Sequence, residues 1–116
     1  MESKLCEKLC QTCRTDSAKM NAEEKAKFMQ ELSGWRIASL QGVEQLIKEF
    51  DFSNFEDALQ FTNRVAEIAQ QEGHHPALVT EWGKVTVHWW THKIKGLHLN
   101  DFICAAKTDK LARETD

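Results

Sequence analysis

The sequence lacks an excess of charge of either sign. Its 15 basic and 18 acidic residues give a formal net charge of only −3. A nucleic-acid-binding domain usually carries a basic patch or stripe, so we expect no nucleic-acid partner. No apolar run approaches the roughly 20 residues that a membrane-spanning helix needs. We therefore expect no association with a membrane.

A hydrophobic leader and a disulfide framework are also missing. Residues 1–6 lack the apolar stretch of a secretory signal, and four cysteines without such a signal are typical of a reducing compartment. We therefore expect a cytoplasmic protein with free thiols. Cys6, Cys10 and Cys13 lie close together, but a closed zinc site needs four ligands and no spacing identifies Cys104 as the fourth.

The length and composition are those of one globular domain. The chain has 116 residues, of which 41% are hydrophobic and 28% charged, enough for a core. Residues 1–20 are polar without a clean period, and we interpret them as an N-terminal tail. Residues 21–116 are predicted to form a single domain.

Hydrophobic periodicity and capping residues predict the order α-β-β-α-β-β-α. The first helix begins at Asn21, which forms a capping box with Glu24, and it ends at Ser33-Gly34. The other predicted elements are strands over residues 35–40 and 43–52, a helix over 53–72 that begins with a capping box in residues 53–56, a hairpin of strands over 77–82 and 84–92, and a last helix from His98. This order predicts an α+β fold in two layers, with a four-stranded antiparallel sheet and three helices on one face.

The helix predicted over residues 53–72 carries two apolar stripes. The first stripe consists of Phe55, Ala58, Leu59, Thr62, Ala66 and Ala69, and the second of Phe61, Val65 and Ile68. We expect the first to face the sheet. The second then needs cover, either from another subunit in a homodimer or homotetramer, or from the tail or first helix of the same chain.

Three histidines in a spaced pattern are the chemically informative residues. His74 and His75 follow the end of the second helix and precede Pro76, and His92 lies at the end of the last predicted strand. Imidazoles exchange protons near neutral pH, and exposed ends of rigid elements often carry catalytic groups. A single such histidine is usually a solvated loop residue. The functional argument therefore depends on the spaced pattern of all three.

The series resembles the signature of the pterin-4a-carbinolamine dehydratase family. Gly73-His74-His75-Pro76 is followed by Trp82 after five intervening residues, by His92 after nine more, and by Asp101 after eight more. Leu32-Ser33-Gly34-Trp35, Phe50-Asp51-Phe52 with Phe55, and Arg64-Val65-Ala66 also match in type and order. The resemblance extends from about residue 21 to residue 111. Departures are Gln70, Leu78, Lys93 and the Ile94-Lys95-Gly96 turn.

The resemblance implies a hydro-lyase that removes water from 4a-hydroxytetrahydrobiopterin, a product of aromatic amino acid hydroxylases, without a metal or another cofactor. It implies His74 and His92 as acid-base residues and His75 as a third site histidine that positions the pterin. The substrate-binding residues that it implies are Gly73, His74, His75, Pro76, Trp90, Thr91, His92 and Lys93. Asp101 has two readings, as a cap of the last helix or as a residue that orients His92.

Two alternatives to a metal-free enzyme remain. Three histidines could instead bind a catalytic zinc ion. Some animal members of the family also bind a transcription factor as a dimerisation cofactor, so this chain could be a protein-binding module. By default we interpret His88 and His98 as surface residues.

Overall fold

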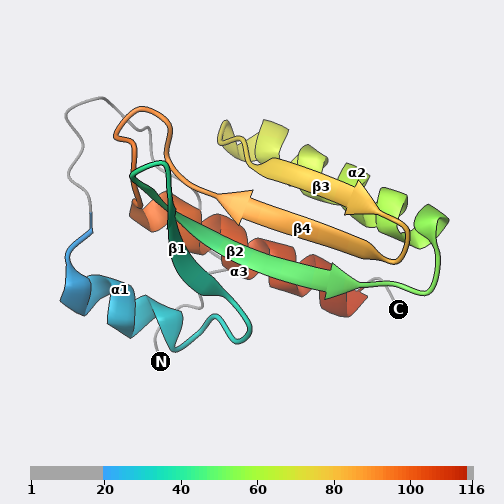
Figure 1. The fold of residues 1–116 in the computed structure, drawn as a ribbon, viewed down its shortest axis with the longest axis horizontal. Coiled ribbons are helices and arrows are strands. Elements are labelled where there is room, and N and C mark those ends of the chain that lie inside the picture. The colour runs from blue at the N-terminus through green and yellow to red at the C-terminus, as the bar shows by residue number, and fades with distance from the viewer. Residues whose placement is uncertain (1–19, 115–116) are drawn as a thin grey trace.

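The structure of the protein, a computed structural model, describes residues 20–114 (Figure 1). Seven elements follow one another in the predicted order. They are α1 (Ala22–Met29), β1 (Arg36–Leu40), β2 (Val43–Asp51), α2 (Phe55–Glu72), β3 (Ala77–Glu81), β4 (Lys84–Trp89) and α3 (Leu99–Glu114).

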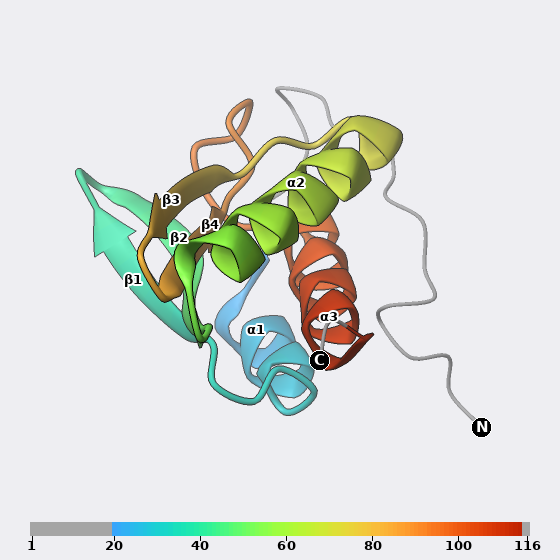
Figure 2. The ribbon, with the colours of Figure 1, turned by 90° about the vertical axis from the view of Figure 1, so that its right-hand side faces the viewer.

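The four strands form one antiparallel sheet in the order β1-β2-β4-β3. Tight turns join the hairpins, and Gly42 and Gly83 supply the positive φ angles (81° and 76°) that such turns need. All three helices lie on the same side of the sheet (Figure 2). The predicted α+β fold with two layers is therefore confirmed.

The core lies between the sheet and the helices because the strands alternate. Val85, Val87 and Trp89 of β4 point toward the helices and are fully buried. Phe102 and Ile103 of α3 meet them from the other layer. Within residues 20–114, no helix is long and apolar enough to cross a membrane.

Several predicted boundaries were wrong. The first helix ends at Met29, where Gln30 caps it, rather than at Ser33-Gly34. The cap of α2 is Asn54 and not Ser53, since the Asn54 side chain accepts a hydrogen bond from the backbone N–H of Asp57 at 2.8 Å. The strand predicted over residues 84–92 ends at Trp89, because the chain leaves the sheet for a turn.

Of the predicted N-terminal tail, only Met20 belongs to the described residues. Cys6, Cys10 and Cys13 lie outside them. Met20 is buried in the core, and its backbone N–H donates to the carbonyl of Leu97. Cys104 is a buried residue of α3. The packed part of the chain therefore includes the last residue of the predicted tail.

The two α2 stripes do not divide as predicted, because the buried face of the helix combines Ala58 and Ala69 of the first stripe with Phe61 and Val65 of the second. Phe61 and Val65, expected at a subunit interface, are fully buried in the core. The Phe61 ring contacts Phe50 and Phe52, with centroids 4.9 and 5.1 Å apart. Phe55 and Leu59, expected to face the sheet, are instead 45% and 42% exposed. The stripes are adjacent on the helix, so periodicity alone did not decide which faces inward.

Replacement of Phe61 by Asp is expected to unfold the protein. The change removes a core ring, which costs about 3–5 kcal/mol even for an apolar replacement, and it places a carboxylate among aromatic side chains. Leu59→Asp is the matched control on the same helix, because Leu59 is half-exposed. Circular dichroism should show native helix content for Leu59→Asp and a loss of it for Phe61→Asp. A native melting curve for Phe61→Asp would contradict the packing.

Candidate active site

The end of α2 determines where the histidine pair lies. Gly73 adopts the left-handed conformation (φ 64°, ψ 30°), and its N–H donates to the carbonyls of Ala69 and Gln70. The N–H of His74 also donates to the Ala69 carbonyl, at 3.1 Å. This C-cap fixes the direction in which the chain leaves α2, and with it the positions of His74 and His75. Pro76 follows them and precedes β3.

His74 is a buried member of the site. Its Nε2 lies 2.5 Å from Oδ1 of Asp101, and its ring stacks on Trp89 with centroids 5.7 Å apart and planes 4° apart. Only 7% of the residue is exposed. The structure therefore holds His74 on both sides, through a carboxylate and through an aromatic face.

Asp101 is fully buried and accepts three hydrogen bonds. Besides His74 Nε2, its donors are the Thr91 hydroxyl at 2.7 Å and the backbone N–H of His98 at 2.9 Å. The bond to His98 is the expected cap of α3. The carboxylate holds His74, whereas the sequence suggested His92 as the histidine that Asp101 orients.

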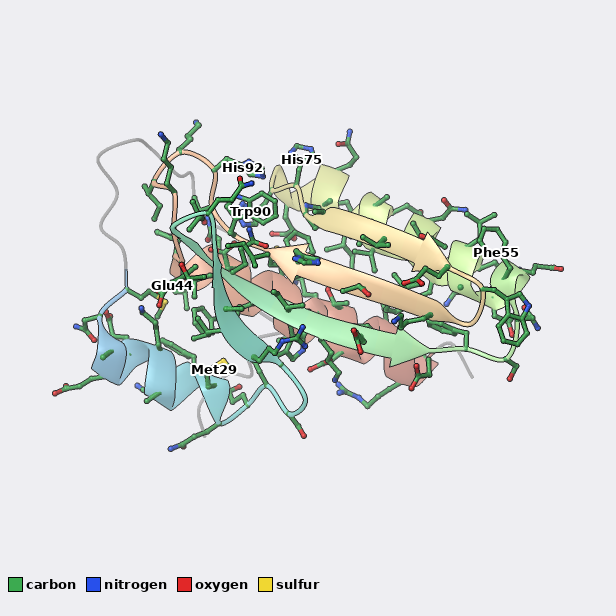
Figure 3. The ribbon with its side chains drawn as sticks, viewed as in Figure 1. Met29, Glu44, Phe55, His75, Trp90 and His92 are labelled. Atoms are coloured by element: carbon green, nitrogen blue, oxygen red, sulfur yellow. The ribbon has the colours of Figure 1, made fainter. Side chains whose placement is uncertain are left out.

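A turn after β4 places His92. Thr91 and Gly96 pair across the turn, with the Thr91 N–H 2.9 Å from the Gly96 carbonyl oxygen. This brings His92 back toward the α2 end, where its Nε2 donates to the carbonyl oxygen of His75 at 3.2 Å. The His92 ring also contacts Trp90, with centroids 4.5 Å apart. His75, Trp90 and His92 lie at the same end of the molecule (Figure 3).

His75 and His92 are exposed, in contrast to His74. The His75 ring is hydrogen-bonded through Nε2 to Oε1 of Gln70, at 2.8 Å. Lys93 is exposed in the turn beside His92. The structure thus brings together the predicted residues of the histidine pair, the turn and the start of α3. Gln70 and Trp89 were not predicted as site residues. The sequence offered a signal only for Gln70, which lies within about one helical turn of the histidine pair.

The two remaining histidines have defined partners instead of the simple surface positions expected. His88 Nδ1 lies 2.9 Å from Oε1 of Gln45, on the sheet face opposite the helices. Burial, followed by the charge of Arg36, lowers the pKa of His88 below its ordinary value of 6.5. His98 Nδ1 accepts the backbone N–H of Asn100 at the start of α3. Neither ring joins the three-histidine site.

The site histidines take their hydrogen-bond partners from the protein itself. Among residues 20–114, no group of three or more His, Cys, Asp or Glu side chains is arranged to hold a metal ion. The Nε2 atoms of all three site histidines are occupied by oxygen atoms of the protein. The arrangement suits proton transfer at the remaining ring nitrogens.

Known proteins resemble this chain along almost its whole length. A relative from Saccharophagus degradans is 54% identical over 107 residues, covering 92% of this chain and 95% of its own. A relative from Vibrio vulnificus is 50% identical over 104 residues, covering 90% and 94%. Both are named pterin-4-alpha-carbinolamine dehydratases, with the name itself marked as provisional.

Solved structures share the fold. The crystal structure of a transcriptional coactivator/pterin dehydratase from Brucella melitensis matches with a TM-score of 0.74 and 26% identity, covering 82% of this chain and 99% of that one. A pterin dehydratase-like protein that is a RuBisCO assembly factor in the alpha-carboxysome matches with a TM-score of 0.58 at 21% identity, which shows the fold alone. The model of the family named pterin 4 alpha carbinolamine dehydratase matches residues 18–111. The chain therefore belongs to the pterin 4 alpha carbinolamine dehydratase family.

Proposed function

We propose that the protein dehydrates 4a-hydroxytetrahydropterin to the quinonoid dihydropterin and so recycles the cofactor of an aromatic amino acid hydroxylase. The observation that carries the proposal is the contact between His75 and His92. The His92 ring bonds the backbone carbonyl of His75, so two exposed imidazoles from different segments lie close together, as a site that exchanges protons with a small molecule requires. Family membership supplies the substrate class.

The reaction needs one proton delivered and one removed. The lone pair of the ring nitrogen next to carbon 4a expels the hydroxyl group, which leaves as water once it is protonated. A proton is then taken from the ring system to give the neutral product. We propose His75 and His92 as the groups that exchange these protons, because both are exposed. Trp90, which contacts His92, offers an aromatic face for the flat pterin.

We propose that His74 acts mainly by shaping the site. Its ring is enclosed between Asp101 and Trp89 and has little exposure. The resemblance implied His74 and His92 as the acid-base pair, and the burial of His74 favours His75 in its place. His74 remains next to the substrate position and keeps the α2 end joined to α3. Lys93, Gly73, Pro76 and Thr91 complete the proposed binding residues.

A protein-binding role is the second candidate. The Brucella melitensis protein of similar fold is described as a transcriptional coactivator as well as a pterin dehydratase. Scaffold binding alone gives no reason for two exposed histidines from different segments that lie close together. The histidine arrangement therefore favours the enzyme.

We also propose that the chain forms a symmetric homodimer or homotetramer, through a different α2 stripe from the one predicted. Phe55 and Leu59 are exposed one turn apart on α2, with 45% and 42% of each residue accessible. Burial of each such side chain stabilises an assembly by up to about 1.5–3 kcal/mol. A second copy of the chain would cover this surface.

His75→Ala and His92→Ala should each lower the dehydration rate by about 10²-fold or more, because each removes a positioned acid-base group. An ultraviolet assay with synthetic 4a-hydroxytetrahydropterin measures the rate. His88→Gln is the control, since the His88 ring is hydrogen-bonded to Gln45 and to none of the site histidines. The parent rate should survive exhaustive chelation of metals. Parent rates in both variants, or activity that returns only with added zinc, would contradict the proposal.

His74→Ala should lower stability as well as activity. It removes one of three donors from the fully buried Asp101 carboxylate, and an unsatisfied buried group of this kind costs about 1–3 kcal/mol. His75→Ala removes an exposed ring and should melt close to the parent. Urea unfolding followed by circular dichroism compares the two variants. Equal stability of His74→Ala and His75→Ala would show that the Asp101 contact contributes little.

Leu59→Asp should weaken assembly without unfolding the subunit, because it places a charge in the exposed stripe of α2. Gln60→Asp is the matched control, since it adds the same charge next to Leu59 on the same helix. Sedimentation equilibrium at micromolar concentration measures the mass. A parent protein with the mass of one 13.4 kDa chain would rule out the oligomer.

A further inference from the structure

Each of the three site histidines meets an oxygen atom at Nε2. These atoms are the Asp101 carboxylate for His74, the Gln70 side-chain carbonyl for His75, and the His75 backbone carbonyl for His92. Carbonyl and carboxylate oxygens accept hydrogen bonds and cannot donate them. The Nε2 atom of each neutral ring therefore carries the hydrogen, and Nδ1 keeps the lone pair that can take up a proton.

The acceptor for His75 differs from the other two. The His92 acceptor is part of the backbone, and the His74 acceptor is a buried carboxylate that also caps α3. Gln70 is an exposed, uncharged side chain in the last turn of α2. It contacts His75 because the left-handed Gly73 turns the chain back over the end of the helix. The fold itself has no need of this side chain.

We propose that Gln70 is a positioning residue for His75. Its amide oxygen holds the ring in one orientation and in the Nε2–H tautomer, so that Nδ1 is the atom that exchanges a proton with the substrate. This inference rests on the proposed function, because it takes His75 as a group that meets the pterin. A structural role alone would leave the position of the ring hydrogen irrelevant to the rate.

Substitutions at Gln70 separate the possible roles. Lysine can only donate a hydrogen bond, so Gln70→Lys should reverse the contact and favour a ring with its hydrogen on Nδ1. Leucine removes the partner and should give a mixture of the two tautomers. Glutamate keeps an accepting oxygen, so Gln70→Glu should retain the Nε2–H tautomer of the parent.

The tautomer can be measured without substrate. Long-range ¹H–¹⁵N correlation spectra of protein with ¹⁵N-labelled histidine, recorded near pH 8 where imidazoles are mostly neutral, distinguish the two ring nitrogens. Gln71→Lys is the control, because Gln71 is the next residue of α2 and lines a separate groove with Lys107 and Lys110 of α3. An increase of the Nδ1–H form of His75 in Gln70→Lys but not in Gln71→Lys is expected. No greater increase in Gln70→Lys than in the control would overturn the proposal.

The rate then tests whether the tautomer matters for chemistry. Gln70→Lys should lose about 10²-fold in kcat, the lower end of what an acid-base group contributes, while KM changes less. Gln70→Glu should recover most of that loss. Parent kcat in Gln70→Lys, despite a reversed tautomer, would overturn Nδ1 as the exchanging atom. If the parent itself does not dehydrate the pterin, the proposed function fails while the spectra still decide the role of Gln70.

Discussion

The Asp101 carboxylate is the point on which the candidate site depends. It is fully buried, and its three donors come from three different segments: the end of α2, the turn after β4 and the start of α3. Burial of a carboxylate is unfavourable unless hydrogen bonds satisfy its oxygen atoms. The three segments are therefore held together, because separating any one of them would leave part of this charge without a partner.

The rest of the site is arranged around this buried contact. The stack of His74 on Trp89 connects the carboxylate to the core strand β4. His75 and His92 lie outside it, where both are exposed and joined through one hydrogen bond. The buried contact thus supports two exposed imidazoles. The fold maintains the positions of these rings while leaving them accessible to solvent.

The apolar faces of the helices explain why this arrangement lies at one end of the sheet. Phe61 and Val65 fix α2 against the strands, so the C-terminal end of the helix lies where β4 leaves the sheet. Phe55 and Leu59 remain exposed on the same helix. The helix therefore completes the core, ends at the histidine pair and leaves two apolar side chains in contact with solvent.

Local sequence determined the order of the elements and the end of α2 at Gly73, and it identified the three histidines as the candidate site. Capping, alternation and residue spacing all act over a few neighbouring residues, so they can be read from the sequence. The cap of α3 by Asp101 was also visible in the spacing from His98. Tertiary structure alone decided that Asp101 contacts His74, that His74 is buried while His75 and His92 are exposed, and which residues of α2 enter the core. These outcomes depend on side chains far apart in the sequence that meet only after the sheet and helices pack, and local periodicity carries no information about such contacts.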